Sequence, residues 1–596
     1  RAVMTDRKTV VYSTPDGVVH AIEPKGVKEA LASLQSDCWI AAMDKEMANL
    51  IAHDAFHYVP YDSVVASGKR VLRMTWVFKI KVNAEGRLDK YKARFCVVGT
   101  GQVKGEDFWE SFASGARGSS VRLVIIMTTV QDWIDFHFDL DGAYLDACID
   151  ADVYVMQPAG MPEVRGPHGE RMVMALDKAI YGTVQAGRLF TKKFRAALVA
   201  IGFEVSLDDE SVYRLNHVLG RIILSTHVDD GVGGASSQAV LEWFYDQIIA
   251  QGFTFSARGP WHTVLGFMVT RDRLRRTTTL SAAKQIRELA RQHLASEAAA
   301  DLDPATPTAQ SIMHLEPPDA NESPEEAALN AGWRSEARSL KGALVHIQQV
   351  HPAICHGVSR CCQYMAVPTR ESHAAAKRVL AWLAKRADMG ITYGAPHLKT
   401  LEDLLPPDVD IPPMSDERDF SLTCCVDSDL PGRALLPNES MIVDEGSHRA
   451  QLGYVISLAG AAFDESSRRQ TSTAIDVAAA ESFAASVAGA VLLHVCGVVR
   501  FVSFGVLGNE PVRMWCDNTA AVLAGNDSTS IKRLAYIARR VRFLQELVVR
   551  GVVKLLNVDG TANPADGFTK HLAKAVFRMY MSRVYNVVAA LFKVSH

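Results

Sequence analysis

Residues 222–234 have the sequence Ile-Ile-Leu-Ser-Thr-His-Val-Asp-Asp-Gly-Val-Gly-Gly, in which an apolar run leads into Asp229 and Asp230. The glycine-rich segment that follows predicts a β-hairpin with both carboxylates at its tip. Turns favour Asp and Gly for backbone reasons alone, so an ordinary turn is one interpretation. The other is a site for Mg²⁺, which takes oxygen ligands and would need a third carboxylate from another strand.

A third carboxylate is available upstream. An apolar strand at 133–140 delivers Asp139 near its end, just before the turn Gly142-Ala143-Tyr144. This placement predicts that Asp139 joins the hairpin aspartates. The neighbouring acids are rivals for the same role: Asp132, Asp135 and Asp141.

The totals describe an ordinary globular chain of several domains. Its 596 residues predict three or four units, and 48% hydrophobic and 22% charged residues show no bias towards disorder. A net charge of −3 gives no overall basic signature for nucleic acid, so such contacts must come from local groups of cations. The ten cysteines form no C-x-x-C pair, which argues against zinc and favours free thiols. No secretory signal is recognised, and a start at Arg1 suggests a fragment or a processed product.

Basic residues gather on a second predicted hairpin. Strands at 71–82 and 91–99 carry Lys79, Lys81, Lys90, Lys92 and Arg94. These basic side chains either form a solvated strand face or bind phosphate groups. Ser36-Asp37 is expected to cap a helix with an apolar stripe beginning at Trp39, and a second helix is expected from about 120 to 130.

The second half predicts two linkers and a last domain. Pro-, Ala- and acid-rich composition marks linkers at 298–332 and 397–418, with a helical segment at 333–396 between them. In residues 419–596, acids follow strands or lie on helices: Asp427, Glu481, Asp517 and Asp566. The apolar stretch 487–507 favours a buried helix and a strand over a membrane span. A later helix has an arginine face that either follows a nucleic-acid backbone or is solvated (Arg533, Arg539, Arg540, Arg542).

Short motifs in this order resemble the reverse transcriptase and ribonuclease H portion of a copia-type, Pseudoviridae-like LTR retrotransposon Pol polyprotein. The matching motifs are Trp76-Val77-Phe78-Lys79, Tyr91-Lys92-Ala93-Arg94, Ala143-Tyr144-Leu145, Val153–Gly160, Tyr181-Gly182 with Gln185-Ala186, Val228-Asp229-Asp230 and Leu265-Gly266. The resemblance implies an α+β multidomain fold: a right-hand polymerase with fingers, palm and a thumb-like part at 26–297 after an uninformative leader at 1–25. A helical connection and a ribonuclease H-like α/β domain would follow.

The implied activity is RNA-directed DNA synthesis with an associated ribonuclease H, at two sites that each hold two Mg²⁺ ions, with Mn²⁺ as a substitute. The resemblance assigns catalysis and metal binding to Asp139, Asp229 and Asp230 in the first site, and to Asp427, Glu481, Asp517 and Asp566 in the second. It assigns substrate contacts to Tyr144, Lys92, Arg94 and Gln185.

The expected partners are an RNA template, a DNA primer, an RNA–DNA hybrid and dNTPs, together with retrotransposon integrase and capsid proteins, and no membrane. The life cycle of such elements implies a cytoplasmic virus-like particle with nuclear entry. The chain also departs from the pattern at His227, where Tyr is usual, and in the loop from Thr183 to Phe190. These departures support an alternative: a decayed or domesticated remnant that binds nucleic acid or a protein without catalysis.

Overall fold

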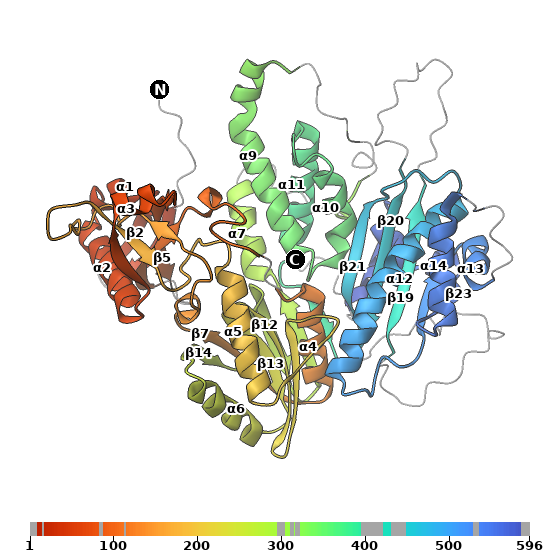
Figure 1. The fold of residues 1–596 in the computed structure, drawn as a ribbon. Coiled ribbons are helices and arrows are strands. Elements are labelled where there is room, and N and C mark those ends of the chain that lie inside the picture. Colours follow the sequence, from red (N-terminus) through yellow and green to blue (C-terminus); the bar gives the residue numbers. More distant parts are fainter. Residues whose placement is uncertain are drawn as a thin grey trace.

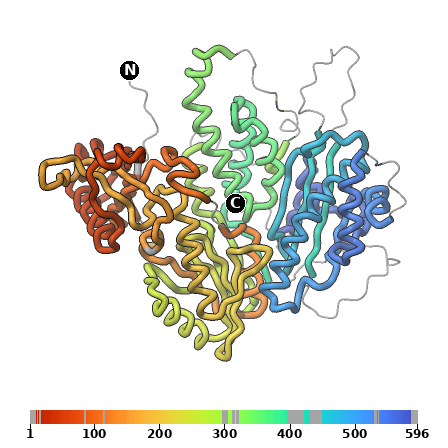
Figure 2. Tube along the Cα trace, in the orientation of Figure 1, coloured from red at the N-terminus to blue at the C-terminus, as the bar shows by residue number. Residues whose placement is uncertain are grey.

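The computed structural model describes residues 9–14, 17–82, 87–111, 115–294, 304–309, 315, 322–394, 421–430, 449–527, 534 and 536–585. Along the chain lie an N-terminal unit, a central unit around a six-stranded sheet, a group of helices, and a C-terminal unit around a five-stranded sheet (Figure 1). The colours of Figure 2 follow the chain through these four parts, from red at the N-terminal unit to blue at the C-terminal one.

The N-terminal unit packs helices on small sheets. Its helix α2 buries Trp39, whose ring meets the edges of Phe78 and Tyr91 with centroid distances of 5.1 and 4.7 Å. The predicted cap Ser36 is instead the first helical residue. The elements are β1 (Thr9–Thr14), β2 (Gly17–Ile22), α1 (Val27–Leu31), α2 (Ser36–Ala52), β3 (Phe56–Pro60), α3 (Tyr61–Ala66), β4 (Val71–Leu72), β5 (Met74–Val82), β6 (Leu88–Val97), β8 (Tyr154–Val155) and β9 (Met172–Leu176).

The segment expected to be an uninformative leader is partly structured. Strands β1 and β2 pair antiparallel, and the hydroxyl groups of Tyr12 and Tyr91 lie 2.6 Å apart. Directly after β2, Glu23 accepts hydrogen bonds from Lys79 Nζ and from the Ile80 backbone. Residues 9–23 therefore belong to the N-terminal unit and brace the β5–β6 hairpin.

The central unit has three layers. Its sheet has the order β10-β11-β12-β13-β7-β14, with α5 and α6 on one face and α4 on the other. This matches the predicted strand before Asp139 and the predicted hairpin at 222–234. The elements are α4 (Gly118–Val130), β7 (Ile134–Leu140), α5 (Ala186–Ala200), β10 (Glu204–Val205), β11 (Val212–His217), β12 (Gly220–His227), β13 (Asp230–Ala235), α6 (Gln238–Ala250) and β14 (Phe255–Gly259).

Glycines in β13 allow its neighbours to come close on both faces. A Cβ atom at Gly231 would lie 2.1 Å from the Phe138 ring of β7, and one at Gly234 would lie 2.1 Å from Thr128 Oγ1 of α4. Such distances are shorter than real contacts, so these positions require glycine. The glycine-rich stretch is thus a strand that packs closely against Phe138 on one face and α4 on the other.

A group of helices with a small sheet follows the central unit. Helix α9 starts at Pro324 behind a capping box formed by Ser323 and Glu326, so the predicted linker 298–332 ends earlier than expected. The predicted helical segment also ends in a strand, β18, which pairs with β17. The linker 397–418 lies outside the described residues. The elements are β15 (Thr263–Val264), β16 (Phe267–Asp272), β17 (Thr277–Ser281), α7 (Ala283–His293), α9 (Pro324–Ile347), α10 (Cys355–Cys362), α11 (Arg370–Ala384) and β18 (Ile391–Tyr393).

The C-terminal unit is a mixed sheet of order β21-β20-β19-β22-β23, in which β22 and β23 run parallel to β19. Helices α12, α13 and α14 lie together beside it (Figure 1). The elements are β19 (Thr423–Asp429), β20 (Gln451–Leu458), β21 (Ala461–Arg469), α12 (Val477–Val502), β22 (Val512–Cys516), α13 (Thr519–Asn526), α14 (Ala538–Val549), β23 (Val553–Asn557), the 3₁₀ turn η8 (Pro564–Phe568) and α15 (Lys574–Tyr585).

Helix α12 joins the C-terminal and central units. Among the described residues it is the one helix long and apolar enough to cross a membrane, and 67% of its apolar window is buried. Its C-terminal end meets the central sheet, where Arg214 of β11 donates to the Phe501 carbonyl at 3.2 Å and covers the Phe501 ring. The predicted buried helix at 487–507 is confirmed to Val502, but the next strand begins only at Val512.

Candidate active sites

The hairpin and β7 bring three carboxylates together. Asp230 opens β13 directly opposite Asp139 of β7, and the Asp229 carbonyl accepts from the Leu140 amide at 3.0 Å. One oxygen from each of Asp139, Asp229 and Asp230 lies within 4.8 Å of the others. The register of two antiparallel pairs therefore assembles the cluster that the sequence predicted.

The tip of the hairpin carries backbone strain. Val228 has φ = 57°, a left-handed conformation that a β-branched residue rarely adopts. Such a residue costs about 1–3 kcal/mol and persists only where its surroundings hold it. Here the β12–β13 and β13–β7 pairings hold the turn, and the same pairings place Asp230 opposite Asp139.

The rival acids belong to another network. Asp135 accepts from Arg271 at 2.6 Å and from Arg273 at 3.1 Å, and Asp132 forms ion pairs with the same two arginines. Asp141 is exposed beyond the end of β7 and is not part of the cluster. The structure thus selects Asp139 among the candidates.

Charge repulsion and burial perturb the cluster. The pKa of Asp230 is raised to about 6, first by burial and then by the charges of Asp229 and Asp139. Burial also raises the pKa of Asp229. Ser256 Oγ donates to Asp139 at 2.6 Å, a contact that no pattern in the sequence announced. Within the described part of the chain no cation forms an ion pair with these three carboxylates.

The predicted substrate residues differ in their surroundings. Tyr144 meets Tyr181 edge-on at 4.9 Å between ring centroids, and the Arg94 guanidinium lies 4.7 Å from the Tyr181 ring centre. Lys92 is half-buried on the same hairpin, where burial and the charge of Arg94 lower its pKa. Tyr144 and Arg94 lie near the cluster: after burial, the charge of Asp229 raises the pKa of Tyr144, and the charge of Arg94 opposes the rise in the pKa of Asp229.

Gln185 is less available than the resemblance implies. Its side chain is fully buried, its amide nitrogen donates to the Asp107 carbonyl at 2.9 Å, and its oxygen accepts from Gln102 at 3.0 Å. With both ends of the amide engaged, Gln185 connects the start of α5 to the 102–107 loop. Its position favours a structural role in the loop before α5 over direct contact with a substrate.

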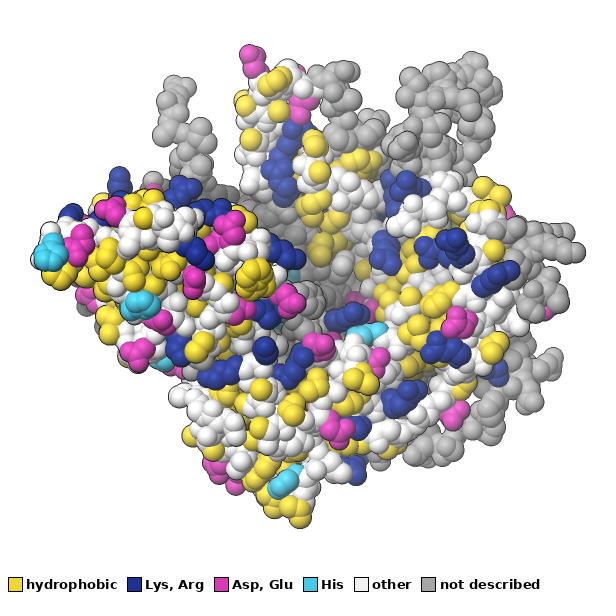
Figure 3. Space-filling model, in the orientation of Figure 1, with side chains coloured by type: hydrophobic (Ala, Val, Ile, Leu, Met, Phe, Trp, Pro, Cys, Tyr) yellow, Lys and Arg dark blue, Asp and Glu magenta, His cyan; other side chains and the backbone are white. Residues whose placement is uncertain are grey.

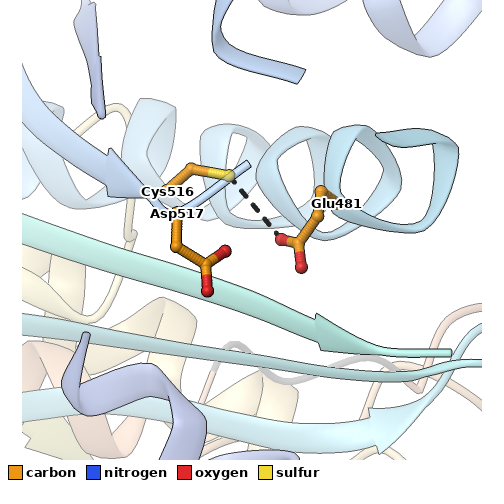
Figure 4. A group of neighbouring side chains, drawn as sticks. All are labelled: Glu481, Cys516 and Asp517. Carbon is orange, nitrogen blue, oxygen red and sulfur yellow. Dashed lines mark hydrogen bonds between the residues drawn. The ribbon is translucent and has the colours of Figure 1, made fainter. Parts of the chain in front are cut away.

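The C-terminal sheet assembles a second group of acids. Asp427 lies on the central strand β19, Asp517 follows β22, and Asp566 lies in η8; one oxygen of each lies within 4.8 Å of the others. Glu481 of α12 joins from the side, with ligand atoms close to Asp517 and Cys516 (Figure 4). All four predicted acids therefore lie in one region of the unit.

Protein donors already contact this second cluster. Glu481 accepts from the Ser428 amide at 2.9 Å and from Cys516 Sγ at 3.6 Å. Thr569 Oγ1 donates to Asp427. Lys570 Nζ lies 3.2 Å from Asp427 Oδ1 and 3.1 Å from Asp566 Oδ1. Sequence reasoning missed Thr569 and Lys570, although the spacing of four residues between Asp566 and Lys570 is typical of side chains that meet.

The acids of the second cluster are hard to ionise together. Burial and the charge of Asp427 raise the pKa of Asp566 to about 7, and burial raises the pKa of Glu481 well above its ordinary value. Asp517 is shifted in the same direction for the same reasons. Both clusters offer several carboxylate oxygens at short range, the donor set that hard divalent cations prefer. The side chains present therefore fit such ions.

Comparison with known proteins agrees with this geometry. Residues 60–293 match the family described as reverse transcriptase (RNA-dependent DNA polymerase). The chain is 26% identical over 580 residues to the retrovirus-related Pol polyprotein from transposon RE2 of Arabidopsis thaliana, covering 96% of this chain and 35% of the relative. It is 25% identical over 558 residues to that from transposon TNT 1-94 of Nicotiana tabacum, covering 94% of this chain and 38% of the relative.

Among solved structures, the foamy viral protease-reverse transcriptase in complex with double-stranded DNA aligns with 83% of this chain and 68% of its own, at a TM-score of 0.38 and 11% identity. The chain spans about a third of the length of the curated relatives it matches. It carries a reverse transcriptase-family domain at residues 60–293 and is related along nearly its whole length to retrotransposon Pol polyproteins, as the resemblance to the copia type implied.

Proposed function

We propose that this chain is an RNA-directed DNA polymerase with an associated ribonuclease H, which copies retrotransposon RNA and degrades the RNA strand of the resulting hybrid. The observation that carries this proposal is the presence of two carboxylate clusters on two different sheets of a chain related to Pol polyproteins. A single cluster would suit one reaction, whereas two separate clusters suit synthesis and strand removal.

In the first site Asp139, Asp229 and Asp230 would hold divalent cations, and the primer end and the incoming dNTP would bind beside them. Two Mg²⁺ ions per site, or Mn²⁺ in their place, would lower the pKa of the attacking hydroxyl or water and neutralise charge on the phosphates. Tyr144 lies under the sugar and excludes a 2′-hydroxyl, while Lys92 and Arg94 contact the triphosphate.

In the second site Asp427, Glu481, Asp517 and Asp566 would hold the cations, and the RNA strand of the hybrid would bind beside them. The hydrogen bonds from the Ser428 amide and Cys516 orient Glu481. Distinction between the strands rests on the 2′-hydroxyl, which RNA alone presents.

The units would then divide the work in the manner of a right-hand polymerase. The N-terminal unit acts as fingers, the central sheet as palm, and α7 to α11 as a thumb-like part and connection to the ribonuclease H-like unit. Partners are an RNA template, a DNA primer and the hybrid, with integrase and capsid proteins of the same element. The setting is a cytoplasmic virus-like particle with nuclear entry.

Basic side chains support contact with a nucleic-acid backbone. Figure 3 shows several Lys and Arg side chains on the exposed face of the C-terminal unit. On α14, Arg539 and Arg542 are exposed, whereas Arg540 covers the Phe483 ring with its Cζ 3.7 Å from the ring centre. Arg533 lies outside the described residues. The exposed pair is available to phosphates, and Arg540 anchors α14 on α12.

The test uses two reactions and two variants of the intact chain. Primer extension on an RNA template with Mg²⁺ is expected to disappear in Asp229→Asn and to persist in Asp427→Asn. Cleavage of a preformed RNA–DNA hybrid is expected to show the reverse pattern. Loss of both reactions in both variants would show that the clusters do not act separately.

The alternative is a decayed or domesticated remnant that binds nucleic acid or a protein without catalysis, which His227 and the altered segment from Thr183 to Phe190 favour. The engaged amide of Gln185 in that segment is a specific observation on its side. Under this alternative, the folded parent chain binds a hybrid but neither extends a primer nor cuts RNA.

A further inference from the structure

Lys570 bridges two of the four acids in the second cluster. Its ammonium group lies 3.2 Å from Asp427 Oδ1 and 3.1 Å from Asp566 Oδ1. The Asp427 side chain is fully buried, whereas 35% of the Lys570 side chain is exposed. A long, partly exposed side chain thus brings a positive charge to a buried carboxylate.

The two clusters differ in this respect. In the described part of the chain, Asp139 receives a neutral hydroxyl from Ser256, and no ammonium or guanidinium group forms an ion pair with Asp139, Asp229 or Asp230. In the second cluster, one oxygen of Asp427 accepts a hydrogen bond from Thr569 Oγ1 and the other accepts one from Lys570 Nζ. Only the second cluster therefore has its own counter-cation.

An ammonium group and a divalent cation compete for these oxygens. Mg²⁺ binds carboxylate oxygens at about 2.0–2.1 Å and demands near-octahedral geometry around itself. Lys570 uses oxygens of both Asp427 and Asp566, and its charge repels a second cation so close by. Entry of a divalent cation into the Asp427–Asp566 gap therefore requires the ammonium to withdraw.

We propose that Lys570 is a resident counter-cation, which neutralises the second cluster while no divalent cation is bound and withdraws when one enters. The inference rests on the proposed function, since it assumes that the cluster takes such cations. Lys570 then sets the affinity for the cation, because each cation that binds must first break its two charge-assisted hydrogen bonds. Exposure of the side chain gives it room to swing into solvent without moving the backbone.

The test measures Mn²⁺ binding directly, through the electron paramagnetic resonance signal of free Mn²⁺, and thermal unfolding in EDTA. All chains carry Asp229→Asn and Asp230→Asn, so that the first cluster does not contribute. Lys570→Met is expected to bind Mn²⁺ about tenfold more tightly, the equivalent of one charge-assisted hydrogen bond, and to unfold at a lower temperature in EDTA. Lys574→Met removes the same charge from an exposed position four residues further along the chain, at the start of α15, and is expected to change neither quantity.

Lys570→Gln provides a second neutral side chain if Lys570→Met does not fold, and Lys570→Arg is expected to keep the parent affinity. Equal or weaker Mn²⁺ binding in the neutral variants would overturn the role of Lys570 while leaving the cation site intact. Absence of Mn²⁺ binding to the parent and to every variant would instead contradict the proposed function itself.

Discussion

The protonation of Asp230 governs when the first cluster can take a cation. Its pKa is raised to about 6 by burial and by two neighbouring carboxylates. A divalent cation requires ionised ligands, so its affinity should fall as the pH drops through 6, by about tenfold per pH unit below that value. Mn²⁺ titrations between pH 5 and 8 on Asp427→Asn, which disables the second cluster, would measure this decline. A constant affinity across the range would contradict it.

The contribution of Asp230 to the stability of the fold depends on pH in the opposite direction to its affinity for a cation. The pKa of Asp230 is higher in the folded chain than its ordinary 3.8, so the folded state holds the proton more tightly than the unfolded state. Its contribution to stability is present below about pH 4 and is lost as the pH rises through 6. Without metal, the first cluster therefore contributes least to the stability of the folded chain at neutral pH, where its carboxylates are ionised and could bind a cation.

Tyr181 acts through another residue. The Tyr181 ring meets the Tyr144 ring edge-on, and the Arg94 guanidinium lies over the face of the Tyr181 ring. If Tyr144 excludes the 2′-hydroxyl, Tyr181→Ala removes the wall that holds the Tyr144 ring and should lower discrimination of dNTPs against ribonucleotides by up to about tenfold, since an aromatic pair contributes about 0.5–1.5 kcal/mol. Tyr181→Phe keeps the ring and should keep the selectivity. Single-nucleotide incorporation with both nucleotide types would measure the ratio, and equal loss in both variants would argue against the ring contact.

At the scale of elements, the close packing of β13 against β7 and α4 requires glycine, which has no side chain. Gly231→Ala would place a Cβ 2.1 Å from the Phe138 ring and should destabilise the chain by about 1–3 kcal/mol, the usual cost of overpacking. Gly332→Ala is the matched control, because Gly332 lies within α9 with open space around it and should gain up to about 1 kcal/mol. Denaturant unfolding of both variants would compare them. Similar stabilities would show that β13 can move away from β7.

The strand ends, turn and helix positions of the seven acids follow from local patterns, but their selection from among other acids rests on the resemblance to the copia type. Asp139 could not be separated from Asp135 by pattern, since only the contact with Arg271 and Arg273 removes Asp135 from the site. Lys570 was missed because its partner Asp427 lies 143 residues away. Gln185 was assigned by motif alone, and its burial depends on a loop that the motif does not describe.

At the scale of the molecule, α4 links the two catalytic candidates. One face of α4 covers β13, which carries Asp230, and the helix also packs against α12 and β21 of the C-terminal unit. The buried apolar side chains of these elements form one continuous cluster. The two carboxylate clusters are thus held on a shared core, which should keep the distance between them constant.

A buried ion pair crosses this interface. Arg122 of α4 lies 3.3 Å from Glu465 of β21, with 8% and 3% of the two side chains exposed, and it also donates to the Gln349 carbonyl at 2.6 Å. Burial raises the pKa of Glu465 to about 7, an effect that the charge of Arg122 partly offsets. The folded state therefore disfavours the Glu465 charge, and this part of the stability is lost as the pH rises from about 4.5 through 7.

Arg122→Met should accordingly destabilise the chain by about 3 kcal/mol or more at pH 8, because it leaves a buried carboxylate without its cation. The loss should shrink at pH 5, where Glu465 can bind a proton instead. Arg550→Met breaks an exposed pair with Glu546 and should change stability by less than about 1 kcal/mol at either pH. Unfolding followed by separate probes in the central and C-terminal units would show one shared transition in the parent. Two transitions in the parent, or a pH-independent loss in Arg122→Met, would mean that the ion pair does not bind the two units into one body.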